Sequence, residues 1–299
     1  MFSGFDGSIR SKRRRAGSRP RVESLEVRRP LASGGDLAVG AAAEALVGGL
    51  APYSDTGASA TDGITNVSRP TFLGQAARWA NVQLFAVAAS SWPTESRVLG
   101  QTIAGQDGSW TMQAAYLPDG VYTVTAVETP PSGSPGQPVV LVPSLTIDTI
   151  APRVHGLAFN PRHGTITAVI SDVGAGLDES TATDPSNYTV VPPSTIIGRN
   201  PGPGGGPIAS PAISGFYSDA SAYTVQLDFG GGAGRAWPRG RYRFQVRSGG
   251  VADRAGNALD GEFTGSLPSG DGVAGGNYIA DLFNRQAGRR PPRARLPRA

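Results

Sequence analysis

The sequence predicts an all-β protein made of two β-sandwiches in tandem, with disordered basic tails at both ends. Three observations support this prediction. The 299 residues include 42 Gly and 25 Pro, roughly twice the usual combined share of about 12%. Charged residues make up only 17%, against about 25% in typical proteins, which disfavours long helices. Short apolar segments alternate with turn residues over a length that suits two modules of about 100 residues.

The N-terminal region shows no sandwich pattern. Residues 1–36 contain the basic run Lys12–Arg15 and almost no apolar periodicity, so we expect a disordered or processed sorting segment. Residues 37–52 are rich in alanine and form a linker or a signal-like segment. Their apolar run is shorter than the roughly 18 residues that a spanning helix requires. We therefore predict no transmembrane span.

The first module is predicted over residues 53–152. Asp-Gly pairs at 62–63, 107–108 and 119–120 favour tight turns, because glycine tolerates the positive φ that such turns need. The strands expected between and after these turns cover residues 82–87, 109–115, 121–127 and 139–148. Pro152 cannot donate a hydrogen bond to a sheet and suits a domain boundary.

The second module is predicted over residues 153–267. Alternating patterns place strands at 154–159, 165–171, 187–191, 222–229 and 241–248. Residues 198–215 are so rich in Gly and Pro that we expect a long mobile loop. Residues 268–299 lose the alternation and are predicted to form a disordered basic tail.

Composition excludes several kinds of chemistry. The chain has no Cys, which removes thiol nucleophiles and thiolate metal sites. His155 and His163 are the only histidines, too few for a multi-histidine zinc site. The adjacent carboxylates of Asp178 and Glu179 have no predicted pocket, which disfavours a glycosidase. We therefore predict a protein that is not an enzyme.

The basic residues are concentrated at the ends of the chain. Residues 1–30 hold nine basic and three acidic residues, and residues 281–299 hold six and one. Of the 27 basic and 23 acidic residues in the chain, 12 and 19 remain for residues 31–280. A nucleic-acid module carries its positive charge on the fold, so this acidic middle predicts no nucleic-acid partner.

The first module resembles the bacterial immunoglobulin-like (Ig-like) repeats of large surface adhesins. The likeness rests on SDTGASATDGITNVSRPTFLGQA (54–76), GQDGSWTM, LPDGVYTVTA and the closing SLTIDTIAP. The chain departs from those repeats at ETPPSGSPGQ (128–137), where they often carry an Asp and a Gly-Asn. The resemblance implies an Ig-like sandwich and a place outside the cell or on its surface.

Two further resemblances point the same way. The second module is loosely similar to Ig-like domains of bacterial surface-layer proteins, through ISDVGAGLDESTATDPSNYTVV (170–191) and VADRAGNALDGEF (251–263). RVESLEVRRPLAS (21–33) resembles the planctomycete LEPR-XLL sorting motif, although Val27 replaces its Pro and Pro30 its first Leu. These likenesses imply an exported protein.

Calcium is the one cofactor for which the sequence offers ligands. Calcium binds six to eight oxygen atoms, which acidic loops at the ends of a sandwich supply. We expect Asp148, at the module boundary, to converge with Asp55, Asp62, Asp172 or Asp253. The sequence favours a second interpretation, in which these acids cap turns by bonding to nearby backbone groups.

Aromatic and basic residues suggest a second kind of site. Trp92 and Trp237 each precede a proline, and we expect them to be exposed in loops where they stack on sugars. In such a site Arg241 and Arg243 pair with the negatively charged groups of an anionic glycan. The sequence favours the simpler interpretation, in which these arginines are the solvated face of an edge strand. Trp110, beside an Asp-Gly turn, is expected in the core.

These observations lead to one functional hypothesis and two alternatives. The leading hypothesis is an exported, non-enzymatic structural or adhesive protein of the cell surface. Its partner is then a cell-surface or extracellular-matrix component, with polysaccharide as a candidate. The first alternative is a carbohydrate-binding accessory module. The second is a fragment of a larger multidomain surface protein.

Overall fold

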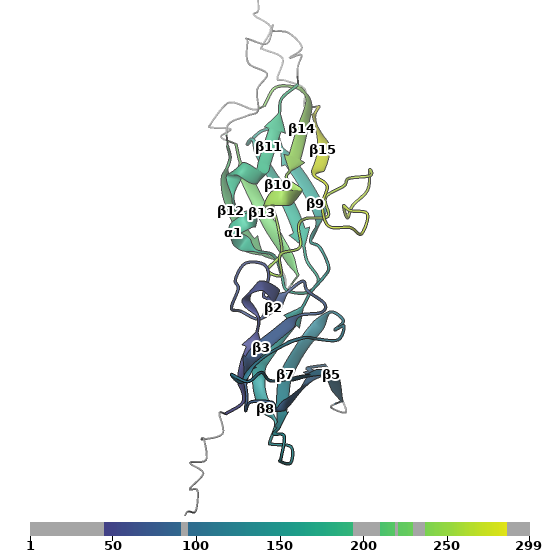
Figure 1. Ribbon diagram of the computed structural model, residues 1–299. Coiled ribbons are helices and arrows are strands. Elements are labelled where there is room, and N and C mark those ends of the chain that lie inside the picture. The colour runs from purple at the N-terminus through teal and green to yellow at the C-terminus, as the bar shows by residue number, and fades with distance from the viewer. Residues whose placement is uncertain (1–44, 91–94, 194–209, 219–220, 230–236, 286–299) are drawn as a thin grey trace, which may run out of the picture. The chain divides into compact units, whose positions relative to one another are not determined.

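The computed structural model describes residues 45–90, 95–193, 210–218, 221–229 and 237–285 (Figure 1). All of them belong to one compact unit, Ala42–Ala299. The predicted sorting segment, Trp92 and residues 286–299 lie outside the described residues. The prediction of a linker or signal-like segment at 37–52 is wrong in part, because Val47–Leu50 form a strand that pairs with residues 72–75. Within the described ranges no helix has the length and apolar character that crossing a membrane requires.

The first sandwich consists of two sheets that enclose one core. One sheet has the order β1-β3-β6 and the other the order β2-β8-β7-β4-β5. The strands are β1 (Val47–Leu50), β2 (Ile64–Thr65), β3 (Thr71–Gln75), β4 (Asn81–Ala88), β5 (Ser96–Ile103), β6 (Ser109–Gln113), β7 (Gly120–Thr129) and β8 (Val139–Ile147), with a short 3-10 turn η1 (Pro52–Ser54). Tyr122, Val124 and Ala126 of β7 are buried, as the alternation in the sequence predicts.

Two of the three predicted Asp-Gly turns have the required backbone conformation. Gly63 and Gly108 adopt φ values of 71° and 79°, whereas Gly120, with a φ of 151°, is the first residue of β7. A Cβ atom at residue 63 would lie 2.8 Å from the carbonyl oxygen of Ser144. Glycine therefore serves two purposes at this position: it permits the turn and it allows close approach of the neighbouring backbone.

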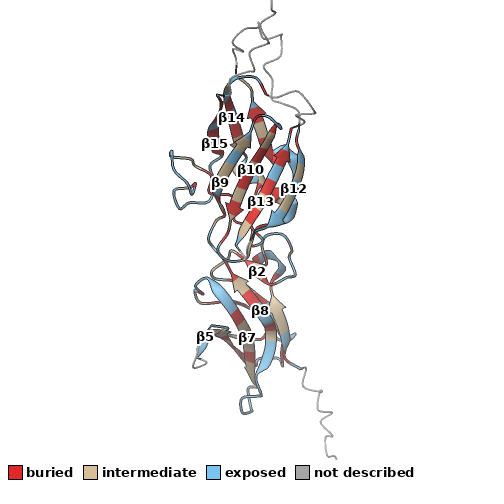
Figure 2. Cartoon of the chain, turned by 180° about the vertical axis from the view of Figure 1, so that it is seen from behind, coloured by how far each residue is buried: buried red, intermediate tan, exposed pale blue. Residues whose placement is uncertain are grey.

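The second sandwich also has two sheets, with the orders β12-β13-β10-β9 and β11-β14-β15. Its elements are β9 (Arg153–Asn160), β10 (Thr165–Ser171), α1 (Glu179–Ala182), η2 (Pro185–Asn187), β11 (Tyr188–Val191), β12 (Ala212–Tyr217), β13 (Ala222–Asp228), β14 (Gly240–Val246), η3 (Ser248–Gly250) and β15 (Tyr278–Asn284). Ile166 and Val225 from one sheet share a core with Phe244 and Tyr278 from the other. Figure 2 shows the buried positions of both sandwiches in red. The all-β prediction is confirmed.

The structure corrects the prediction for the end of the chain. Residues 268–299 were expected to be disordered, but β15 pairs with β14 from Tyr278↔Val246 to Asn284↔Gly240. Tyr278, Ala280 and Leu282 are buried, and the residues between them are exposed. This alternation is typical of a half-buried strand.

The structure also corrects part of the predicted Gly/Pro-rich loop. Of residues 198–215, those from Ala212 onward belong to β12, which pairs with β13. Gly215 is required there because a Cβ atom would lie 2.3 Å from the hydroxyl oxygen of Tyr223. A glycine that reads as a loop residue in the sequence thus makes room for a core side chain.

Candidate metal centre

Three aspartates from separate loops converge in the interior. Asp148 directly follows β8, Asp172 directly follows β10, and Asp253 lies in the loop after η3. Their exposed fractions are 1%, 2% and 1%. One carboxylate oxygen from each lies within 4.8 Å of the others. The three form the carboxylate cluster.

Backbone amides hold two of these side chains. The Asp148 carboxylate accepts hydrogen bonds from the N–H groups of Ile150 (3.1 Å) and Ala175 (2.6 Å). Gly174 permits this approach, because a Cβ atom there would lie 2.3 Å from Asp148 Oδ2. Asp172 Oδ2 accepts from the N–H of Gly176 at 2.8 Å. The loop over residues 173–178 therefore wraps the carboxylates.

Asn257 orients the third side chain. Its backbone N–H and its Nδ2 donate to the two oxygens of Asp253 at 2.8 and 2.7 Å. The same Nδ2 donates to the carbonyl oxygen of Asp148 at 2.9 Å. The loop of Asp253 is held to the wrapping loop by a β-bridge between Asp253 and Leu177. Asn257 thus ties Asp253 to the chain at Asp148.

Ionisation of the three aspartates in the cluster is electrostatically unfavourable. Burial, reinforced by the nearby carboxylates of Asp148 and Asp253, raises the pKa of Asp172 from its ordinary 3.8 to about 7. Burial likewise raises the pKa of Asp253 to about 6 and also raises that of Asp148. Burial and like charges both disfavour the ionised form. No basic side chain in the described part of the chain forms an ion pair with these three aspartates.

The donor set fits a hard divalent cation. Asp172 Oδ1 is buried and has no hydrogen-bond partner, which is uncommon for a buried polar atom. Calcium is bound by carboxylate and carbonyl oxygens, and three carboxylates in one place supply the negative charge. If a calcium ion is present, Asp148, Asp172 and Asp253 are the residues that would hold it.

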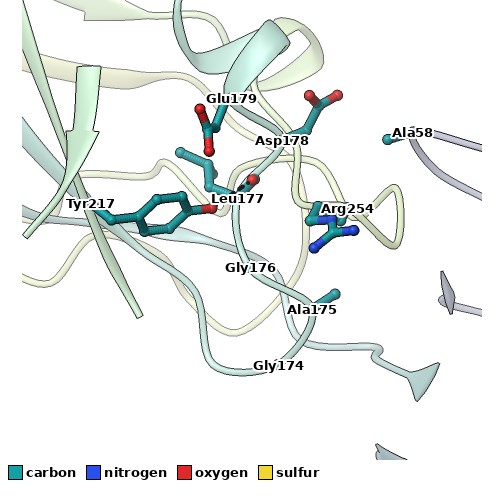
Figure 3. A pocket seen from close by; sticks show the side chains of 9 residues that line it. All are labelled: Ala58, Gly174, Ala175, Gly176, Leu177, Asp178, Glu179, Tyr217 and Arg254. Carbon is teal, nitrogen blue, oxygen red and sulfur yellow. Dashed lines mark hydrogen bonds between the residues drawn. The ribbon is translucent and has the colours of Figure 1, made fainter. Parts of the chain in front are cut away.

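The loop that wraps the cluster also lines an open pocket of about 650 Å³ (Figure 3). The side chains of Asp178, Glu179, Tyr217 and Arg254 border it. The Tyr217 hydroxyl donates to the carbonyl oxygen of Leu177 at 3.0 Å, and the Arg254 backbone N–H donates to that of Gly176 at 2.8 Å. The cluster therefore fixes one wall of the pocket.

Comparison with known proteins finds a family match for part of the chain. Residues 42–149 match the model of a family described as a bacterial Ig-like domain. Among solved structures, a chain titled "Marsupial T cell receptor" is similar at a TM-score of 0.21 and 9% identity, over 64% of this chain and 88% of that chain. No curated protein matches.

The carboxylate cluster lies at the C-terminal end of the region that matches the Ig-like family. The match ends one residue after Asp148, so the matched region contains Asp148, whereas Asp172 and Asp253 lie beyond it. Asp148 lies in the middle of the SLTIDTIAP segment (144–152) that carries the adhesin-type resemblance. Residues of the second sandwich therefore complete the cluster.

The other two acids of the predicted calcium set are placed elsewhere. Asp55 and Asp62 are not members of the cluster. Asp55 Oδ2 accepts from the backbone N–H of Gly63 at 3.2 Å, and Asp62 Oδ1 accepts from that of Ile64 at 3.0 Å. Both aspartates line a separate pocket in the first sandwich. The five predicted ligands thus divide into a group of three and a pair.

One of the two tryptophans of the predicted glycan site is buried, and the other, Trp92, lies outside the described residues. Trp237 is not exposed: it retains only 9% of its accessible surface, and its ring packs against Phe159 and Tyr242 with centroids 5.3 and 4.8 Å apart. Asn284 Nδ2 donates to its carbonyl oxygen at 2.6 Å. At Trp237 the following proline was therefore a misleading sign of exposure. Trp110 is buried, as predicted.

The two arginines of the predicted glycan site are exposed. The side chains of Arg241 and Arg243 are 59% and 58% exposed on β14. Arg241 forms an ion pair with Asp281 of β15, and Arg243 lies 4.0 Å from the same carboxylate. The exposed tryptophan among the described residues is instead Trp79, at 57%, with a φ of 62°.

A second acidic group has no counterpart among the sites predicted from the sequence. Asp260, Glu262 and Asp271 lie together. Asp260 is 1% exposed, and Arg153 Nη2 lies 2.8 Å from its Oδ2. Because 107 positions separate these two partners in the numbering, no local pattern could reveal the pair.

Proposed function

We propose that the protein is an exported, non-enzymatic structural module of the bacterial cell surface, and that calcium bound by the carboxylate cluster stabilises its fold. The bacterial Ig-like match over residues 42–149 supports the surface role. The net acidic middle of the chain and the resemblance to adhesin repeats support it as well. An adhesive role toward a cell-surface or extracellular-matrix component follows from the same resemblance.

One observation carries the calcium part of the proposal. Asp172 Oδ1 is buried, lacks a partner and belongs to a side chain only 2% exposed. A buried charge without a counter-charge is costly. A cation that binds only the folded chain removes that cost and shifts the unfolding equilibrium toward the native state.

Thermal unfolding of the full chain tests this proposal. At a calcium concentration about 100-fold above the dissociation constant, the native state gains about 2.7 kcal/mol. We expect the melting temperature to rise by several degrees relative to protein in chelator. Asp172→Asn removes this rise, whereas Asp107→Asn, at an exposed turn, keeps it. An equal melting temperature with calcium and with chelator would contradict the proposal.

Localisation needs its own experiment. Fractionation of the source cells, together with protease treatment of intact cells, shows where the protein resides. We expect the protein in the surface or extracellular fraction and digestion from outside. Recovery solely from the cytoplasm would overturn the surface role without affecting the calcium result.

The exposed arginines favour a second candidate function, binding of an anionic polysaccharide. Arg241 and Arg243 present guanidinium groups on an exposed strand face, and such groups pair with carboxylate or sulfate. Retention on a heparin column that is lost in the Arg241→Ala/Arg243→Ala double variant would support this function. Equal retention of the variant would exclude these residues from it.

A further inference from the structure

A second buried carboxylate lies in the first sandwich, apart from the cluster. Asp55 follows η1 and is 7% exposed. Its Oδ2 accepts from the N–H of Gly63 at 3.2 Å, but its Oδ1 is buried and has no hydrogen-bond partner. Burial raises the pKa of Asp55, the Gly63 N–H opposes this shift, and the charge of Asp62 adds to it. The native fold thus leaves one acceptor of Asp55 unused.

The pocket in front of Asp55 has a volume of about 490 Å³. Asp62 is exposed and contributes a second carboxylate to its lining. The apolar part of the lining includes Leu50, Pro52, Leu141 and Val142, and the hydroxyl residues Thr61 and Ser144 line the pocket as well. The pocket therefore combines an aliphatic wall with a buried acceptor and an exposed negative charge.

This lining suits an organic cation better than a metal ion. Calcium requires six to eight oxygen ligands. The side chains that line this pocket supply two carboxylates and the hydroxyl groups of Thr61 and Ser144, and the aliphatic side chains supply no ligand. A primary ammonium has three donors and a compact charge, while an aliphatic stem gains by covering apolar surface. The two kinds of lining match the two parts of an alkylammonium ion.

We propose that this pocket binds the ammonium end of an unbranched aliphatic amine, of the kind found in a lysine side chain or a free diamine. Asp55 Oδ1 accepts a hydrogen bond from the ammonium, and Asp62 adds a second negative charge. The stem lies along Leu50, Pro52 and Leu141. The site is independent of the carboxylate cluster and of the calcium proposal.

The chain itself contains a single lysine, Lys12, which lies outside the described residues. No lysine of the described part can therefore fill the pocket. The ammonium comes from another molecule or from the segment that carries Lys12. The Lys12→Gln variant distinguishes these two sources.

The test uses the full chain, labelled with ¹⁵N, and n-butylammonium chloride as the probe. We expect saturable shifts of the Gly63 and Ile64 amide resonances, because these residues hold the two carboxylates. n-Butanol, which has the same stem without the charge, serves as the control ligand and produces no comparable shifts. Binding that appears only in Lys12→Gln also supports the pocket chemistry and identifies Lys12 as its native occupant.

Two variants make the assignment specific. Asp55→Asn should weaken n-butylammonium binding roughly tenfold or more, because the acceptor of the ammonium hydrogen bond loses its negative charge. Asp62→Asn, at an exposed position, should weaken it by a smaller factor and keeps the test valid if Asp55→Asn fails to fold. Asp107→Asn, in a turn of the same sandwich, should bind like the parent protein.

Three results would overturn the proposal. The first is the absence of saturable shifts in both the parent protein and Lys12→Gln. The second is that n-butanol binds the parent protein as tightly as n-butylammonium does, or that Asp55→Asn and Asp62→Asn bind n-butylammonium as tightly as the parent does. The third is displacement of the amine by calcium at lower concentration, with the same amides affected, which would make the pocket a metal site.

Discussion

The two acidic groups around the second sandwich differ in how their buried carboxylates are compensated. In one, Asp260 is 1% exposed and forms an ion pair with Arg153 at 2.8 Å. Its carboxylate also accepts hydrogen bonds from the N–H groups of Asp271 and Gly272, each at 2.9 Å. In the other, Asp172 is equally buried but keeps one oxygen without a partner. The first carboxylate is neutralised from within the chain. The second requires a proton or an external cation.

The largest effect is expected where the internal counter-charge is removed. Arg153→Ala leaves Asp260 buried without its partner, and breaking a buried pair in this way costs about 3 kcal/mol. Urea denaturation of the parent and the variant measures this loss in the free energy of unfolding. Arg241→Ala, which breaks an ion pair on the exposed face of β14, is the matched control and should leave stability unchanged. Equal stability of Arg153→Ala and the parent would break the contrast between the two groups.

The next effect concerns Asp172 in the absence of metal. Asp172→Asn removes a charge that the fold disfavours. In chelator at neutral pH we therefore expect the free energy of unfolding of the variant to exceed that of the parent by roughly 1 kcal/mol or more. With calcium the order reverses, because only the parent binds the ion tightly. Differential scanning calorimetry in the two buffers measures both values. A variant less stable than the parent in chelator would show that the Asp172 charge is already compensated.

The pH dependence of the stability of the metal-free protein also tests whether the Asp172 charge is uncompensated. The pKa of Asp172 is about 7 in the folded chain against an ordinary value of 3.8, so between these values the folded state binds more protons than the unfolded state. Stability therefore falls as pH rises from about 4 to about 7. Melting temperatures in chelator should be higher near pH 5 than near pH 8, and this slope should be smaller in Asp172→Asn. Identical slopes in the parent and the variant would assign the dependence to other groups.

The smallest effect is expected at Glu262, on the edge of the paired group. Its Oε2 is buried and has no partner, but Arg153 already neutralises the neighbouring Asp260. Glu262→Gln should change the free energy of unfolding by less than about 1 kcal/mol and should leave the calcium response intact. Loss of the calcium response in this variant would move the metal site to the second acidic group.

Local patterns predicted the strands and turns well where the alternation was complete. The segment 165–171 was expected as a strand and is β10, and the buried residues of β7 are those that the alternation indicates. β15 was missed because a Gly-rich stretch precedes it, which made the whole C-terminal region look structureless. Trp237 was misplaced because the proline after it says nothing about the aromatic side chains that approach from β9 and β14.

The site depends on contacts that no local pattern contains. The sequence singled out Asp148, Asp172 and Asp253, but their convergence requires three loops to meet. Asn257 and Gly174 are equally important to the arrangement, yet one resembles an ordinary turn residue and the other an ordinary loop glycine. Asp55 and Asp62 share the same residue type and turn context as the three, and only the fold separates them.

Isothermal titration calorimetry of the full chain with calcium tests the central claim most directly. Because protons are bound near pH 6 to 7 by Asp172 and Asp253, calcium must displace them. We predict one calcium ion per chain, with proton release that is larger near pH 6 than near pH 8, and loss of this binding in Asp172→Asn. Absence of binding, or binding that Asp172→Asn leaves unchanged, would contradict the account.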